Sequence, residues 1–583
     1  MNATPTATPS AAPAADVDMV TMSIIDSTMT AICREMGIVL MKTSYSTIFN
    51  EALDFTCVLA GADGELIAQA EYCPSMIGGV PLLLRSCVME IPVDEIEPGD
   101  VLVHNDPYRG GLHCPEHTLI KPVFVDGEIM GFAMTIGHLA EIGGMVPGAF
   151  AGEATEIFHE GIRVPPVKIK SRGEDVEEVW KLLLANVRTP RYNYGDLRAL
   201  IAGVDVGEAR LEAMVRKYGK DVFRKNVADL LDYSEARMRS EIEAIPDGKY
   251  NFQDVIEDDG IEKKPFTIDT TVYVQGDEVV VDYTGSSEQA KGPINATLGV
   301  AYSASYNGML HCTDHTIPKN SGCFRPIRVV APPGSILNVD FPAPEVGGNT
   351  ETHCKIAGTV IGALSPALPD TTMAAEGATH TNFVFGGYDE EADEAFVCYA
   401  IELSGWGGRS FADGNDATDS INGNCRVIPV EVFETRFPLQ CERFELVQDS
   451  GGAGEHRGGL STTRVIRSLN SDITGSQMSD RHANRPWGLH GGQPGGTAGT
   501  WYCAANSADW QGIDAAFGKV SPSKWSNVTI RPGDSIRFQT PGGGGWGDPK
   551  KRPRERVAED LAEGYISEQA AREVYGLGAA GDD

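Results

Sequence analysis

Hydrophobic positions near the start of the chain follow a helical pattern. Apolar side chains at Ile25, Met29, Ile32, Met36 and Val39 recur every three or four residues. That spacing places them on one stripe and predicts an amphipathic helix.

Strand-like sequence follows this helix. Residues 54–70 contain a turn sequence at Ala62-Asp63-Gly64, and residues 123–137 contain one at Asp126-Gly127. Both stretches predict β-hairpins, and the second hairpin runs directly into His138.

The pattern changes twice more. Residues 176–245 are helical in period and are interrupted by Pro190 and Gly219, which predicts three helices. From Tyr250 apolar and polar residues alternate, with a hairpin turn at Gly276-Asp277. Glycine-rich strand-type sequence continues to Gly547. The sequence of residues 549–583 predicts one or two short helices.

These patterns predict an α+β fold with a mixed N-terminal part, a helical middle and a large β-rich second half. A length of 583 residues suggests roughly two to four domains. We expect the following segments: a disordered leader (1–16), an α+β metal-site region (17–175), a helical segment (176–248), a β-rich domain (249–548) and a C-terminal helical tail (549–583).

Composition narrows the classes of function. The formal charge is −34 and 42% of residues are hydrophobic. Such acidity argues against nucleic acid and against anionic membrane surfaces, because phosphates require a basic face. The twelve cysteines contain no C-x-x-C pair, so we expect buried or free thiols in a reducing cytoplasm. No apolar run is long enough to span a membrane, and no secretory signal is recognisable.

The stretch "NDPYRGGLHCPEH" contains a literal H-x-x-E-H, formed by His113, Glu116 and His117. In zinc peptidases this motif lies on a helix. Pro115 inside the motif and Gly110-Gly111 before it disfavour a helix, so we exclude a peptidase site. His113 and Glu116 could still bind a divalent cation from a loop, together with His138 at the end of the next strand. The alternative is a set of ordinary polar loop residues.

Nucleotide-binding motifs are missing. The sequence has no G-x-x-x-x-G-K-[ST] motif. "GGGGWG" (542–547) precedes Asp548-Pro549 rather than a helix, so we interpret it as a structural loop.

Several motifs together resemble the hydantoinase B/oxoprolinase family. They are, in order, "NDPYRGGLHCPEH", "GHLAEIGGMVPG", "HEGIRVPPVKI", "VDYTGSSEQAKGPINA", "DSGGAGEHRGGLS" and "TPGGGGWGDP". The resemblance covers roughly residues 17–575. It implies a hetero-oligomer with two copies of each subunit, in which a hydantoinase A-type partner binds ATP and Mg²⁺ and phosphorylates a small-molecule substrate.

The resemblance also implies a metal site on this chain. Carried over residue by residue, the ligands are Asp54, His113, Glu116 and His138, and Zn²⁺ is favoured over Mn²⁺ or Fe²⁺. Glu116 stands where the family usually has Asp, which lengthens that ligand by one methylene.

The function implied is ATP-dependent hydrolysis of a cyclic amide, a lactam or a hydantoin. The alternatives are a subunit of an acetone- or acetophenone-type carboxylase, which could include small extra subunits, and a non-catalytic scaffold. Asp106 and Glu141 lie close in sequence to the expected ligands and are candidate general bases, or else structural carboxylates. His117 either contacts a metal ligand or the substrate, or is an ordinary loop residue.

Overall fold

The computed structural model describes residues 18–578, so the expected leader lies outside the described residues. The first element is α1 (Met19–Thr43), which begins where the Asp18 side chain accepts a hydrogen bond from the N–H of Thr21. Its buried side chains include Ile25, Met29 and Met36, as the apolar stripe predicts.

A seven-stranded antiparallel sheet forms the centre of the N-terminal half, in the order β2-β1-β5-β4-β3-β6-β7. Both predicted hairpins are confirmed, and Asp126 and Gly127 form the second turn with positive φ angles of 52° and 80°. The strands are β1 (Phe55–Gly61), β2 (Leu66–Gln69), β3 (Val101–His104), β4 (Glu116–Val125), β5 (Glu128–His138), β6 (Val167–Ser171) and β7 (Glu174–Asp175).

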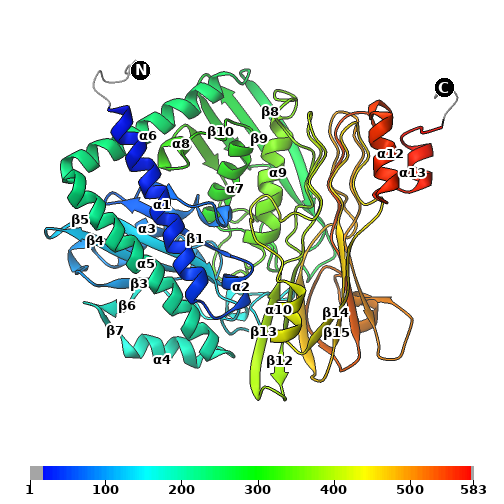
Figure 1. The fold of residues 1–583 in the computed structure, drawn as a ribbon, viewed down its shortest axis with the longest axis horizontal. Coiled ribbons are helices and arrows are strands. Elements are labelled where there is room, and N and C mark those ends of the chain that lie inside the picture. Colours follow the sequence, from blue (N-terminus) through cyan, green and yellow to red (C-terminus); the bar gives the residue numbers. More distant parts are fainter. Residues whose placement is uncertain (1–17, 579–583) are drawn as a thin grey trace.

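Three helices form the middle of the chain, as predicted: α4 (Glu177–Ala185), α5 (Pro190–Tyr218) and α6 (Lys220–Glu243). Helices α1 and α5 cover one face of the sheet (Figure 1). The approach is close at Gly207, where an added Cβ would lie 2.7 Å from the Cβ of Ala133 on β5.

The opposite face of the sheet packs against a second layer. This layer contains α3 (Val80–Glu90), α7 (Leu298–His311), α9 (His353–Leu364) and a four-stranded sheet. The sheet has the order β11-β10-β9-β8, with β8 (Gly248–Ile256), β9 (Phe266–Gln275), β10 (Glu278–Asp282) and β11 (Ile327–Val330). Helices α7 and α9 were not predicted, because they are buried on nearly every side and show no polar face.

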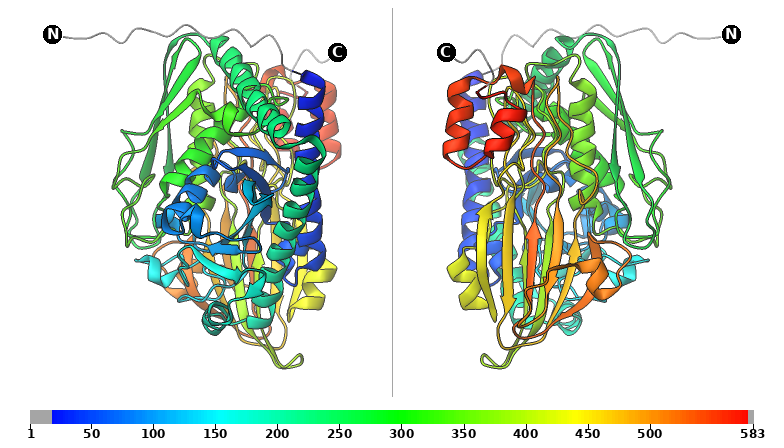
Figure 2. Two further views of the ribbon diagram at one scale, coloured as in Figure 1. Left: turned by 90° about the vertical axis from the view of Figure 1, so that its left-hand side faces the viewer. Right: turned by 90° about the vertical axis from the view of Figure 1, so that its right-hand side faces the viewer.

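Two further sheets pack face to face in the second half around Phe383, Trp525 and Phe538. One has the order β13-β12-β16-β19, with β12 (Asn382–Asp389), β13 (Glu394–Ala400), β16 (Ile473–Met478) and β19 (Lys524–Ile530). The other has the order β14-β15-β20-β17-β18, with β14 (Leu439–Leu446), β15 (Thr462–Ser468), β20 (Ser535–Gln539), β17 (Gly499–Cys503) and β18 (Gln511–Gly512). Figure 2 shows these strands running side by side.

The glycine-rich segments gather into one bundle of extended backbone beside these sheets. The N–H of Gly544 donates to the carbonyl oxygen of Ala375 at 2.7 Å, and that of Gly408 donates to the carbonyl oxygen of Gly544 at 2.8 Å. A Cβ on Gly544 would lie 2.0 Å from the carbonyl oxygen of Trp487, so only glycine fits. The interpretation of "GGGGWG" as a structural loop is therefore confirmed.

The last helices of the described residues are two short ones, α12 (Arg554–Ala562) and α13 (Glu568–Glu573), drawn in red in Figure 2. The predicted α+β fold class is confirmed. All twelve cysteines are free, and eleven of them are buried. Over residues 18–578, no helix combines the length and apolar character that crossing a bilayer requires.

Candidate metal centre

Three of the expected ligands come from neighbouring positions of the central sheet. Glu116 begins β4 and lies directly opposite His138, the last residue of β5. Asp54 immediately precedes β1, and its carbonyl oxygen accepts the N–H of His138 at 3.1 Å. The hairpin therefore returns His138 to the loop, as its turn predicts, and residues directly opposite each other share a face of the sheet.

His113 reaches the same place from the loop before β4. Its Nδ1 donates a hydrogen bond to the carbonyl oxygen of Val346 at 2.9 Å, which leaves Nε2 as the acceptor nitrogen. That Nε2 lies 3.2 Å from Oε1 of Glu116. Because Glu116 lies on a strand, the exclusion of a helical H-x-x-E-H peptidase site is confirmed.

Glu116 is held by a residue that the sequence did not single out. The Nδ2 of Asn349 donates to Oε1 of Glu116 at 2.7 Å. Asn349 lies in a single π-helical turn, Gly348–Thr352, directly before α9. Such turns occur frequently at functional sites.

Aromatic rings enclose His138. Its imidazole stacks on Phe150 with a centroid distance of 5.3 Å and on Tyr399 of β13 with a distance of 4.8 Å. The ring of His113 lies 5.1 Å from it, centroid to centroid. The candidate site is therefore enclosed by both halves of the chain.

Several donor atoms here make no hydrogen bond within residues 18–578. They are Nε2 of His113, Oε2 of Glu116 and both ring nitrogens of His138. All three side chains are buried, and buried polar atoms are rarely left unpaired. Imidazole and carboxylate donors suit a divalent cation, and the other donor atoms of His113 and Glu116 are held by hydrogen bonds.

Burial and mutual repulsion shift the pKa values of these groups. Burial, followed by the charge of Glu116, raises the pKa of Asp54 to about 7. Burial, followed by the neighbouring His113, holds the pKa of His138 well below its ordinary range. Burial opposes the charge on His113, but Glu116 outweighs it and raises the pKa of His113 above its ordinary value.

Asp54 also lies close to two thiols. Among the described residues, one group of three His, Cys, Asp or Glu side chains brings its donor atoms within 4.8 Å of one another: Asp54, Cys73 and Cys425. This group could hold a metal ion. The four expected ligands are not gathered as closely. Leu53 takes a left-handed φ of 63°, and such backbone is often found at functional sites.

A large cleft borders Cys425, although none of the four expected metal ligands lines it. It has a volume of about 1090 Å³ and is lined by α1, β2, the C-terminal part of α7 and residues 403–427. Asp419 and Cys425 belong to its wall. Clefts of this size with a few convergent polar groups are the usual sites of small-molecule binding.

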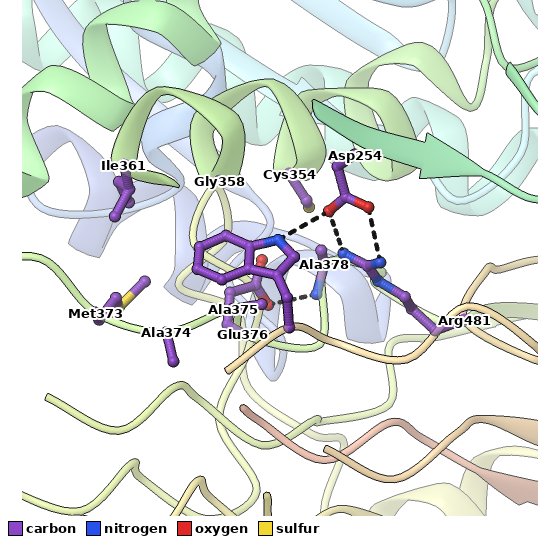
Figure 3. Close-up of a pocket in the computed structure, with 11 residues that line it drawn as sticks. Asp254, Cys354, Gly358, Ile361, Met373, Ala374, Ala375, Glu376, Ala378 and Arg481 are labelled. Atoms are coloured by element: carbon purple, nitrogen blue, oxygen red, sulfur yellow. Dashed lines mark hydrogen bonds and ion pairs between the residues drawn. The ribbon is translucent and has the colours of Figure 1, made fainter. Parts of the chain in front are cut away.

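A second cavity, drawn in Figure 3, is far smaller, at about 10 Å³. Arg481 pairs there with both carboxylate oxygens of Asp254, at 3.0 and 2.6 Å, and the Nε1 of Trp487 donates to the same carboxylate. The space admits about one water molecule. This ion pair links β8 to the segment after β16 and is not a substrate site.

The remaining candidates have structural partners. The carboxylate of Glu141 accepts the N–H groups of Gly143 and Gly148 and a guanidinium N–H of Arg188. Such a set of bonds is typical of a structural carboxylate.

Asp106 and His117 are similarly engaged. Asp106 accepts hydrogen bonds from the N–H of Tyr108 and from the guanidinium of Arg109. His117 follows Glu116 on β4 and therefore points to the opposite face, where it lies among Leu139, Ile142 and Leu197. Burial lowers the pKa of His117 to about 4, so this imidazole is neutral.

The chain is similar in sequence to proteins of one known family. The sequence profile of the hydantoinase B/oxoprolinase family matches residues 18–549. A protein from Pseudomonas sp. strain NS671, named as a D-/L-hydantoinase component, is 32% identical over 96% of this chain and 95% of its own length. The beta chain of caprolactamase from Pseudomonas jessenii is 32% identical, with 96% of each chain covered.

Solved structures show the same fold. The crystal structure of the ATP-dependent caprolactamase from Pseudomonas jessenii superposes with a TM-score of 0.89 over 97% of both chains, at 30% identity. Nucleotide-free acetone carboxylase gives a TM-score of 0.88 over 96% of this chain and 79% of its own, at 20% identity. The second similarity concerns the fold alone.

Proposed function

Because the chain belongs to the hydantoinase B/oxoprolinase family, we propose that it is the metal-bearing subunit of an ATP-dependent enzyme that hydrolyses a cyclic amide. Two relatives that match nearly its whole length are named as subunits of a hydantoinase and a caprolactamase. The observation that carries the proposal is the set of buried, unpaired donor atoms on His113, Glu116 and His138.

The residues that would hold the metal are Asp54, His113, Glu116 and His138. A divalent cation supplies a Lewis acid that polarises a carbonyl oxygen. Val346 fixes the tautomer of His113, since its carbonyl oxygen takes the Nδ1 proton.

The surrounding residues orient these ligands and keep the site dry. Asn349 fixes one oxygen of Glu116 and leaves the other available. Phe150 and Tyr399 pack against the His138 ring and against each other, with 5.1 Å between their own centroids, and the hydroxyl of Tyr399 donates to Oδ1 of Asn382 at 2.6 Å. Electrostatic interactions are stronger in such a water-poor site than in bulk water.

The cleft beside Asp419 and Cys425 provides the path for a small substrate. Activation by ATP belongs to a partner chain, since the sequence of this chain contains no nucleotide-binding motif. The family resemblance supports a hydantoinase A-type partner and a hetero-oligomer with two copies of each subunit. A cytoplasmic location follows from the same proposal, since ATP is the co-substrate.

Elemental analysis of the purified full chain tests the metal site. We expect a divalent metal in the wild type and its loss from the His113→Ala and His138→Ala variants. His117→Ala is the matched control, because this neighbouring buried histidine faces away from the site and its removal should leave the metal content unchanged. Wild-type metal content in both site variants would refute the proposed ligands.

A further inference from the structure

Cys73 and Cys425 differ from the other cysteines of the chain because their sulfur atoms lie close to each other and to a carboxylate, that of Asp54. We propose that Cys73, Cys425 and Asp54 form a second cation site, selective for a thiophilic ion such as Zn²⁺, and that Asp54 is shared with the histidine site. The inference rests on the proposed function only for that sharing. The donor atoms of the three side chains lie within 4.8 Å of one another.

The state of the Asp54 carboxylate supports this site. It is 6% exposed, and no hydrogen bond within residues 18–578 stabilises its charge. A buried carboxylate without a donor is costly unless a cation or a proton compensates it. Asp54 lies within 4.8 Å of both sulfur atoms, and Glu116 and His113 are near enough to act on its charge, so it can serve both donor sets.

Hydrogen bonds with neighbouring side chains and backbone groups fix the positions of the two cysteines. The Sγ of Cys73 lies 3.2 Å from Oγ of Ser75 and 3.6 Å from the carbonyl oxygen of Asn422. The N–H of Cys425 donates to the carboxylate of Asp419 at 2.7 Å. These contacts hold two segments, more than 300 residues apart in sequence, so that both sulfur atoms face one point.

The chemistry of the donors selects the ion. Thiolates favour soft or borderline cations, whereas the histidine and carboxylate set also accepts harder ones. Binding would release the two thiol protons, because the thiolate is the ligand. Three protein donors leave one position of a tetrahedral ion free. Because Cys425 belongs to the wall of the cleft, the ion can enter from there.

Cobalt substitution tests this site on the full chain. We expect the reduced wild type, loaded with Co²⁺, to bind two ions and to show a thiolate-to-cobalt charge-transfer band in the near ultraviolet. Cys73→Ser and Cys425→Ser should each lose the band and one ion. Cys441→Ser is the control for adventitious thiol binding, because Cys441 is the one cysteine that is not buried, and it should keep both.

Further outcomes separate this inference from the proposed function. His138→Ala should keep the charge-transfer band while it loses the other ion. A wild type without the band, but with a metal that His138→Ala removes, overturns the thiolate site alone. A band that survives both cysteine substitutions also overturns it.

A measurement on the wild type covers the case in which the cysteine variants do not fold. Zn²⁺ should protect Cys73 and Cys425 from alkylation by iodoacetamide, as read by peptide mass spectrometry. Equal labelling with and without Zn²⁺, or a Cys73–Cys425 disulfide that persists under reducing conditions, overturns the inference.

Discussion

Asn349 should control how tightly the histidine site holds its metal. Its Nδ2 lies 2.7 Å from Oε1 of Glu116, and the two side chains are only 3% and 4% exposed. A buried hydrogen bond to a charged group contributes about 1.5–3 kcal/mol. Since about 1.4 kcal/mol corresponds to tenfold in affinity, Asn349→Ala should weaken metal binding by about 10- to 100-fold, as second-sphere substitutions generally do.

Competition against a chromophoric chelator measures this change on the purified full chain. Asn193→Ala is the matched control: Asn193 is also buried, and its Nδ2 donates to the carbonyl oxygen of Glu141 at 2.6 Å, away from the ligands. We expect unchanged metal affinity in that control. Unchanged affinity in Asn349→Ala would refute the positioning role, and equal losses in both variants would indicate a general loosening of the fold.

Three predictions concern stability. Burial raises the pKa of Asp196 to about 6, above the value of about 3.9 in an unfolded chain. The folded protein therefore holds this proton more tightly, and stability falls as the pH rises from about 4 to about 6. Asp196→Asn keeps the acceptor of both N–H groups and should flatten that dependence in urea unfolding; an unchanged slope would contradict it. Gly544→Ala, whose Cβ would meet a carbonyl oxygen at 2.0 Å, should cost about 3 kcal/mol or more. Gly358→Ala in α9, where an added Cβ meets open space, should be neutral or stabilising. Thermal unfolding of both variants measures the difference, and an equal loss of stability in the two would refute the packing argument. Arg481→Ala should cost about 3–5 kcal/mol, since it leaves Asp254 buried without its partner; a loss below about 1 kcal/mol would contradict it.

The sequence predicts the peripheral and amphipathic elements well. The stripe of α1, the three middle helices and the hairpin turns at Asp126-Gly127 and Gly276-Asp277 all have clear periods or turn residues. Helices α7 and α9 do not, because burial on all sides removes the polar face that marks a helix.

The candidate site likewise contains residues that the sequence predicts and residues that it does not. His113, Glu116 and His138 are close in sequence, so a hairpin suffices to bring Glu116 and His138 together. Asn349 and Cys425 come from segments more than 200 residues away, and no local pattern marks them. Only the packing of the two halves places Asn349 beside Glu116 and Cys425 beside Asp54.

Ring opening by the reconstituted complex tests the central claim most directly. The full chain and its ATP-binding partner are mixed with ATP and a panel of lactams and hydantoins, and ring-opened product is measured for the wild type and for His138→Ala. We predict ATP-dependent product with the wild type, and none with a His138→Ala complex that assembles normally. Full product formation by that variant complex would contradict the account and would leave this chain as a scaffold.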